Sequence, residues 1–92
     1  MIKHEEKIKK LIESIQIAKE VVDFKESEFL NRADEYDALL NINTLEAHIT
    51  RRNILRLAPN DLDYHALRSA YAELRKQLNK HDYYNICNNN GL

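Results

Sequence analysis

The sequence is poor in residues that interrupt helices. Among its 92 residues there is one glycine, Gly91, one proline, Pro59, and no tryptophan. Hairpins depend on glycine or Asn-Gly turns, so sheets joined by tight turns are not expected. Phosphate-binding loops need several glycines whose backbone approaches the phosphates, which excludes P-loop and dinucleotide-binding enzymes of the common types. These shortages predict an all-α fold.

Cysteines and long hydrophobic runs are also scarce. The single cysteine, Cys87, cannot form an internal disulfide, and the N-terminus carries no basic-then-apolar leader with a small-residue cleavage site. Charged residues interrupt every apolar stretch before it approaches the roughly 18 residues that a membrane span needs. We therefore expect a cytoplasmic protein without a membrane segment.

The length and composition predict one folded domain over residues 1–92. Hydrophobic residues make up 43% and charged residues 32%, a balance typical of globular chains and unlike that of disordered ones. Residues 1–42 carry seven basic and ten acidic side chains, and residues 43–92 carry seven basic and five acidic, giving −3 and +2. Only the second half has a basic excess.

A nearly seven-residue repeat of apolar side chains predicts a long helix over residues 3–41. Its members are Ile8, Leu11, Ile12, Ile15, Ala18, Val22, Phe29, Ala33, Tyr36 and Leu40. A bend is expected near residue 31, where Asn31 and Asp34 are suitable caps for a new turn.

Two shorter helices are expected in the second half. Asn43, with Glu46 three residues later, resembles a capping box and predicts a helix over 44–57. Asn60, followed by acidic residues, suits the start of a helix over 61–82. The asparagine-rich tail, 83–92, is expected to fray.

These elements predict a small helical bundle. The simplest assembly packs the long N-terminal helix against a C-terminal hairpin of the second and third helices, so that their apolar stripes are buried together. This architecture contains no linker and no internal repeat at solenoid spacing.

Residues that could support catalysis or metal binding are few and poorly spaced. Cys87 has His81 and Asp82 one to two turns before it, in a tail expected to be mobile. Asp61 and His65 lie one helical turn apart, but two ligands do not make a metal site. We expect no catalytic residue, no metal and no cofactor, so the protein is predicted not to be an enzyme.

The long helix carries a second apolar stripe, formed by Ile17, Val21 and Phe24 and flanked by Glu20 and Glu28. At about 100° per residue, this stripe lies roughly opposite the first one. In one interpretation it is an interaction surface for a second copy or another protein. In the other, the helix sits centrally in its bundle or breaks near residue 23, so that both stripes are core.

The basic second half suggests nucleic-acid binding as an alternative. Arg51, Arg52 and Arg56 lie in the second predicted helix, and two helices joined by a short turn resemble a helix-turn-helix. Acidic residues at the start of the third helix oppose this interpretation, since phosphates would repel them.

One segment resembles a known family. The residues concerned are Ile42, Asn43, Thr44, Leu45 and Glu46, followed by Asp61 and Leu62. They are similar to part of the Hha/YmoA family of small helical nucleoid-associated modulators. Residues 1 to about 35 have no counterpart there, and the third helix aligns only with a gap. The resemblance implies a partner-binding regulator of transcription and assigns no functional residue.

The leading prediction is a small helical interaction protein: an inhibitor, adaptor or regulatory subunit that self-associates or docks on a larger protein. The abundance of Asn, Ile and Lys is typical of AT-rich genomes, and short helical inhibitors are common in phages and other mobile elements. The alternative is a transcriptional or nucleoid regulator that uses the basic second half.

Overall fold

The computed structural model describes residues 2–92, and the side chains of residues 4–92. They form four helices: α1 (Ile2–Leu39), α2 (Leu45–Leu55), α3 (Asp61–Gln77) and α4 (Lys80–Asn89). No strand occurs within residues 2–92. The predicted all-α fold, with a long first helix packed in a small bundle, is confirmed.

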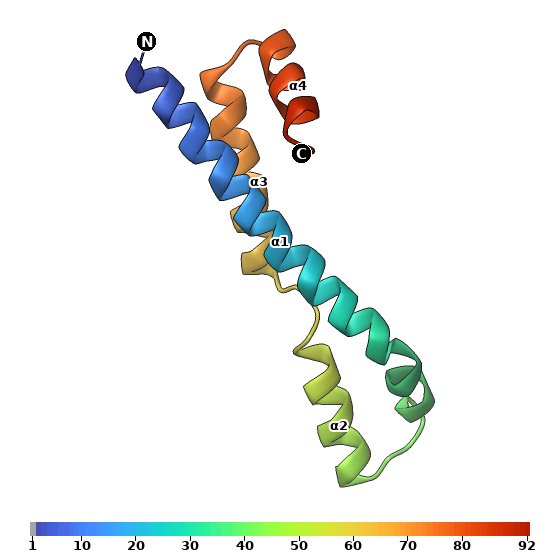
Figure 1. Ribbon diagram of the computed structural model, residues 1–92. Helices are drawn as coiled ribbons and strands as arrows, with labels where there is room; N and C mark the ends of the chain where they lie inside the picture. Colours follow the sequence, from blue (N-terminus) through green and yellow to red (C-terminus); the bar gives the residue numbers. More distant parts are fainter. Residues whose placement is uncertain (1) are drawn as a thin grey trace.

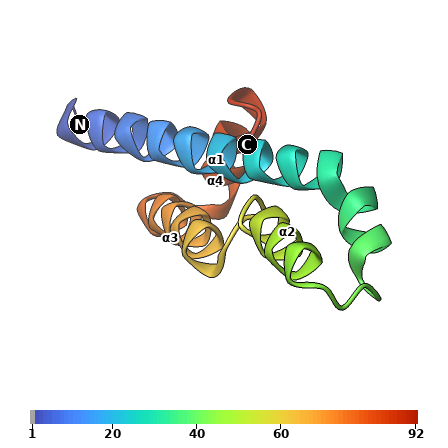
Figure 2. The ribbon, with the colours of Figure 1, turned by 90° about the horizontal axis from the view of Figure 1, so that it is seen from below.

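Helix α1 is the spine of the molecule (Figure 1). At about 1.5 Å per residue its 38 residues span about 57 Å, close to the 61 Å length of the whole chain. Helices α2 and α3 run back along α1 one after the other, and α4 turns back beside α3 (Figures 1 and 2). Within residues 2–92, α1 has Cα atoms within 8 Å of both α2 and α3, and α3 has Cα atoms within 8 Å of α4. Helices α2 and α3 do not come this close to each other. The second and third helices therefore lie end to end along α1, not side by side as the expected hairpin would have them.

Helix α1 is continuous through residue 31, so Asn31 and Asp34 do not cap a new helix. Its last turns, drawn green in Figure 2, lean away from the axis of the rest without a break. Arg51 of α2 holds this end in place, because its guanidinium donates hydrogen bonds to the carbonyls of Leu39 and Ile42, the latter at 2.8 Å. The carbonyls that a helix leaves unpaired at its C-terminus are partly satisfied in this way.

The N-cap of α2 is Thr44 and not Asn43, so the helix begins at Leu45 and one residue later than expected. Thr44 has an extended backbone, and its hydroxyl oxygen accepts a hydrogen bond of 3.1 Å from the backbone N–H of Ala47. That bond satisfies one of the free donors of the first turn, which is the property that makes a residue an N-cap.

The expected long third helix over 61–82 and frayed tail over 83–92 are wrong. Leu78 is extended and ends α3 at Gln77. Asn79 then caps α4, its side-chain oxygen accepting a 2.8 Å hydrogen bond from the backbone N–H of Asp82. Asparagine has poor helix propensity, but burial of Cys87 against the core compensates for it.

The core is thin. Its main cluster joins Ile8 and Ile15 of α1 with Leu74 of α3 and Cys87 of α4. Partly buried residues pack around it: Leu11, Ile12, Leu67, Ala70, Tyr71, Leu78, Tyr83, Ile86 and Leu92. On α2, Ala47 and Ile54 are buried, in the helix that lies along the C-terminal half of α1.

The folded chain exposes more surface than a compact domain of its mass. Its accessible area is 7181 Å², about 1,600 Å² more than the roughly 5,600 Å² expected for a compact monomer. Its radius of gyration is 18.4 Å, against about 12 Å for a compact chain of this length. A single copy therefore leaves surface uncovered that a compact fold would bury.

We expect Leu74→Ala to lower the free energy of unfolding by about 2–5 kcal/mol, because Leu74 is fully buried and the change leaves a cavity. Urea unfolding followed by circular dichroism measures this loss. Leu30→Ala is the matched control: Leu30 is exposed on α1, so its effect should stay within about 0.5 kcal/mol. Equal losses in the two variants would contradict the assigned core.

Candidate protein-interaction surface

Three apolar side chains on the outer side of α1 face solvent. Ile17 is 63% exposed, Val21 40% and Phe24 66%, whereas Ile15 and Val22 on the inner side are buried. The helix does not break near residue 23, and the exposure of these three side chains shows that the helix is not enclosed on both sides. Ile17, Val21 and Phe24 are called the outer strip below.

Ile17 and Val21 of the outer strip line a groove between α1 and α3 of about 400 Å³. Its lining consists of Ser14, Ile17, Ala18, Val21, Asp63, Ala66 and Ala70. The groove exists because small side chains of the two helices face each other there. With one charged residue in this lining, the groove is mainly apolar.

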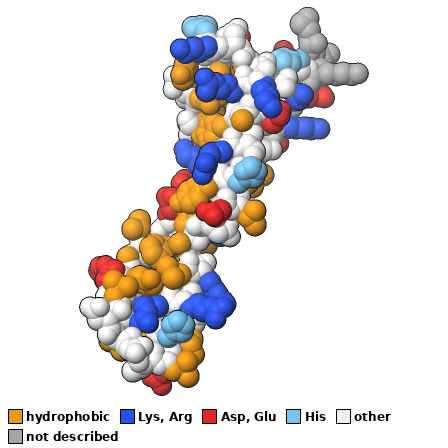
Figure 3. Space-filling model, turned by 180° about the vertical axis from the view of Figure 1, so that it is seen from behind, with side chains coloured by type: hydrophobic (Ala, Val, Ile, Leu, Met, Phe, Trp, Pro, Cys, Tyr) orange, Lys and Arg blue, Asp and Glu red, His pale blue; other side chains and the backbone are white. Residues whose placement is uncertain are grey.

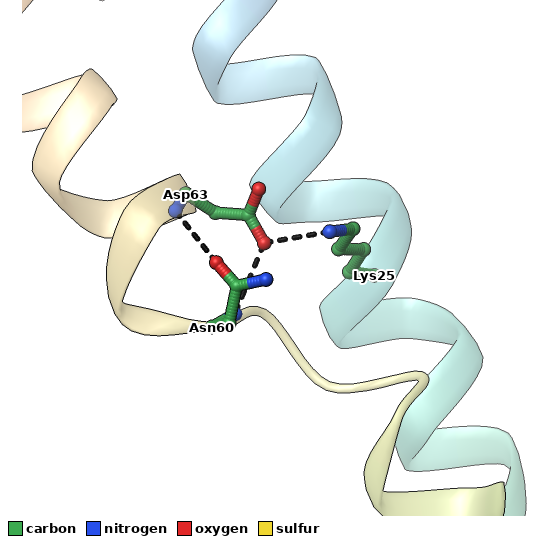
Figure 4. Close-up of polar contacts among 3 residues, drawn as sticks. All are labelled: Lys25, Asn60 and Asp63. Atoms are coloured by element: carbon green, nitrogen blue, oxygen red, sulfur yellow. Dashed lines mark hydrogen bonds and ion pairs between the residues drawn. The ribbon is translucent and has the colours of Figure 1, made fainter.

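Polar contacts hold α3 against α1 beside the groove. Lys25 Nζ lies 2.7 Å from Asp63 Oδ2, and the same oxygen accepts a 3.0 Å hydrogen bond from the backbone N–H of Asn60 (Figure 4). The side-chain Oδ1 of Asn60 in turn accepts a 2.9 Å hydrogen bond from the backbone N–H of Asp63, which completes a capping box. One residue further along each helix, the Tyr64 hydroxyl donates to Glu26 Oε1 at 3.1 Å.

These contacts shift the pKa values of Asp63 and Tyr64 in opposite directions. The hydrogen bond from Lys25, followed by that from the Asn60 backbone, lowers the pKa of Asp63. The hydrogen bond to Glu26 is the main reason that the pKa of Tyr64 is raised. These shifts keep the Asp63 carboxylate ionised and the Tyr64 hydroxyl protonated at neutral pH.

The two acidic residues predicted to flank the outer strip are accessible to different extents. Glu20 is exposed and Glu28 is half-buried. The ion pairs within residues 4–92 are Lys25–Asp63, Arg32–Glu35 and Lys76–Glu73, so neither flanking carboxylate is paired there. Both can therefore interact with a partner.

The three arginines of the nucleic-acid alternative differ in how free their side chains are. Arg51 is engaged with the carbonyls at the end of α1, whereas Arg52 and Arg56 are exposed. Exposed apolar side chains of the same helix lie among them, including Leu45, Ile49 and Leu55. In Figure 3 basic and hydrophobic side chains alternate over the lower part of the molecule instead of forming a continuous basic face.

The other residues singled out from the sequence are not brought together. Cys87 is buried in the core, and the imidazole of His81 lies 3.2 Å from Asn85. His65 faces Ser69 at 3.5 Å. Within the described residues, no group of three or more His, Cys, Asp or Glu side chains is placed to hold a metal ion. In the same part of the chain, no helix combines the length and apolar character of a membrane span.

Comparisons with models of known protein families, with curated proteins and with solved structures find no significant match to this chain. The resemblance of residues 42–46 to the Hha/YmoA family therefore gains no support from them.

The outer strip was predicted from the sequence, whereas the wall of the groove formed by Ala66 and Ala70 of α3 was not. Ala66 and Ala70 are small and lie on the helix surface, so they give only a weak hydrophobic signal. The Lys25–Asp63 pair joins residues 38 positions apart and becomes visible only when α3 is placed on α1.

We expect Asp63→Asn to destabilise the protein at neutral pH, with a difference from wild type that becomes smaller at pH 3. Because the folded-state pKa is lowered below its ordinary value near 3.8, the stabilisation is complete above that value and is lost as pH falls through the folded pKa. Urea midpoints at pH 7 and at pH 3 measure the difference. Asp61→Asn, in the same turn of α3, is the matched control, and a pH-independent effect of Asp63→Asn would contradict the lysine contact.

Proposed function

We propose that this protein is a non-catalytic interaction module that binds another protein chain through the outer strip. The observation that carries the proposal is the exposure of Ile17, Val21 and Phe24 on one face of α1, where Ile17 and Val21 also line an apolar groove. Apolar side chains gathered on one face and bordered by charge are typical of interaction sites, whereas scattered single ones are not.

The proposed role is that of an inhibitor, adaptor or regulatory subunit acting in the cytoplasm, from a phage or another mobile element. Its support is compositional: the chain is short and helical, and it is rich in Asn, Ile and Lys. In this proposal Glu20 and Glu28 orient the partner, because charges around an apolar centre act on specificity and association rate more than on affinity.

We expect Phe24→Asp to abolish association while the chain stays folded, because the residue is exposed and the change places a charge within the apolar outer strip. Two measurements on wild type and variant test this: solution mass by light scattering, and capture of proteins from a cell lysate. Circular dichroism monitors folding.

Leu30→Asp is the matched control, since Leu30 is equally exposed on α1 but lies outside the outer strip. It should change neither mass nor capture. If Phe24→Asp also changes neither, the outer strip is not a binding surface and the proposed function is wrong.

The alternative, a nucleic-acid-associated regulator, now depends on Arg52 and Arg56, because Arg51 is occupied by backbone carbonyls. It predicts a salt-dependent shift of duplex DNA that the double variant Arg52→Ala/Arg56→Ala removes. If the protein gives no shift at low salt, this alternative is excluded.

A further inference from the structure

We propose that the partner of the outer strip is a second copy of this chain, with the two α1 helices packed antiparallel. The proposal rests on the proposed function and names the occupant of the same surface. It is supported by the order of charges along α1, by the position of the groove and by the surface area that one copy leaves exposed.

The outer strip is the middle of a longer repeat on α1 with alternating spacings of three and four residues, which is the pattern of a two-helix seam. Within the described side chains its members are Lys7, Lys10, Ser14, Ile17, Val21, Phe24, Glu28, Asn31 and Glu35. All are exposed except Glu28, which is half-buried. The seam is therefore basic at its N-terminal end, apolar in the middle and acidic at its C-terminal end.

This order of charges favours an antiparallel partner. In a parallel pair, Lys10 would face Lys10 and Glu28 would face Glu28, which repel each other. In an antiparallel pair, the basic end of each helix meets the acidic end of the other while the apolar centres still coincide. The same surface serves both copies, as a twofold interface requires.

The repeat also selects the register. With Lys19 at the midpoint, Ile17 of each copy faces Val21 of the other, and Lys10 faces Glu28. A shift by one repeat in one direction places Glu28 against Ile17, and in the other direction it places Lys10 against Val21. Either shift sets a charge against an apolar side chain, which is costly when the contact is desolvated.

In this register Phe24 of one copy faces Ser14 of the other. Ser14 lines the groove of about 400 Å³, whose other walls include Ala18, Ala66 and Ala70. The largest exposed side chain of the seam therefore meets the hollow made by the smallest ones. Twofold symmetry fills both grooves in the same way.

The exposed area is sufficient for such a dimer. A standard interface buries about 800 Å² on each partner. One copy exposes 7181 Å², an excess of about 1,600 Å² over a compact monomer of its mass, so that an interface of this size fits within the excess.

The test exchanges the charges at the two ends of the seam. Lys10→Glu and Glu28→Lys each turn both terminal pairs of the antiparallel dimer into like-charge pairs, so each should weaken dimerisation about tenfold at low salt. The double variant Lys10→Glu/Glu28→Lys restores both pairs and should dimerise like wild type. In a parallel dimer, residue 10 faces residue 10 and residue 28 faces residue 28. The wild type, the two single variants and the double variant would then all carry like-charge pairs, and the double variant would show no rescue.

Lys9→Glu is the matched control, because Lys9 is exposed beside Lys10 but lies outside the repeat. Its dimerisation should remain within about twofold of wild type at the same salt concentration, since exposed charges outside a contact interact weakly. Dissociation constants come from analytical ultracentrifugation over a concentration series, with circular dichroism as the folding check.

The outcomes separate this proposal from the more general one. At about millimolar concentration even a weak interface of about −4 kcal/mol is half-occupied. A wild type that is still monomeric at that concentration overturns the proposed dimer. If Phe24 is then still needed for capture from lysate, the outer strip binds a different protein and only the dimer is wrong. If the wild type dimerises but neither Lys10→Glu nor Glu28→Lys changes the dissociation constant, the antiparallel register is wrong.

Discussion

The inner face of α1 is the contact on which the rest of the structure depends. Helices α2 and α3 both pack on α1, but within the described residues they do not approach each other. Ile15, in the first half of α1, meets Leu74 of α3, while the second half carries α2. Loss of the continuous α1 would therefore separate the two halves of the chain, because within residues 2–92 no contact between α2 and α3 joins them.

A long spine with its partner helices on one side has a physical consequence. Such an arrangement cannot enclose the spine, so one side of α1 stays in contact with water. The chain places Ile17, Val21 and Phe24 on that side, although charged residues would cost nothing there and the neighbouring turns carry them. Apolar side chains that stay largely exposed in the monomer stabilise it less than buried ones do, which is why we propose a binding role for them.

The long first helix, its second apolar face and the start of α3 were predictable from local sequence patterns. The repeat from Ile8 to Leu40 identified the long helix, and the offset of Ile17, Val21 and Phe24 identified its second face, because both depend only on helical periodicity. Asn60 was also recognised as the start of α3. The tail was not predictable in the same way: Asn79 is one asparagine among several, and the helix after it is stabilised by burying Cys87 in a core built from distant parts of the chain. The end-to-end placement of α2 and α3 and the groove wall at Ala66 and Ala70 likewise depend on tertiary packing, which a single sequence does not encode locally.

The most direct test of the antiparallel pairing uses the wild-type protein. In a mixed sample of isotope-labelled and unlabelled chains, filtered nuclear Overhauser spectra detect contacts between copies only. We predict contacts from the Phe24 ring of one copy to Ser14 and to the Ala66 and Ala70 methyl groups of the other. Contacts between Phe24 and Phe24, or no contacts between copies at concentrations where the mass is that of a dimer, would contradict the account.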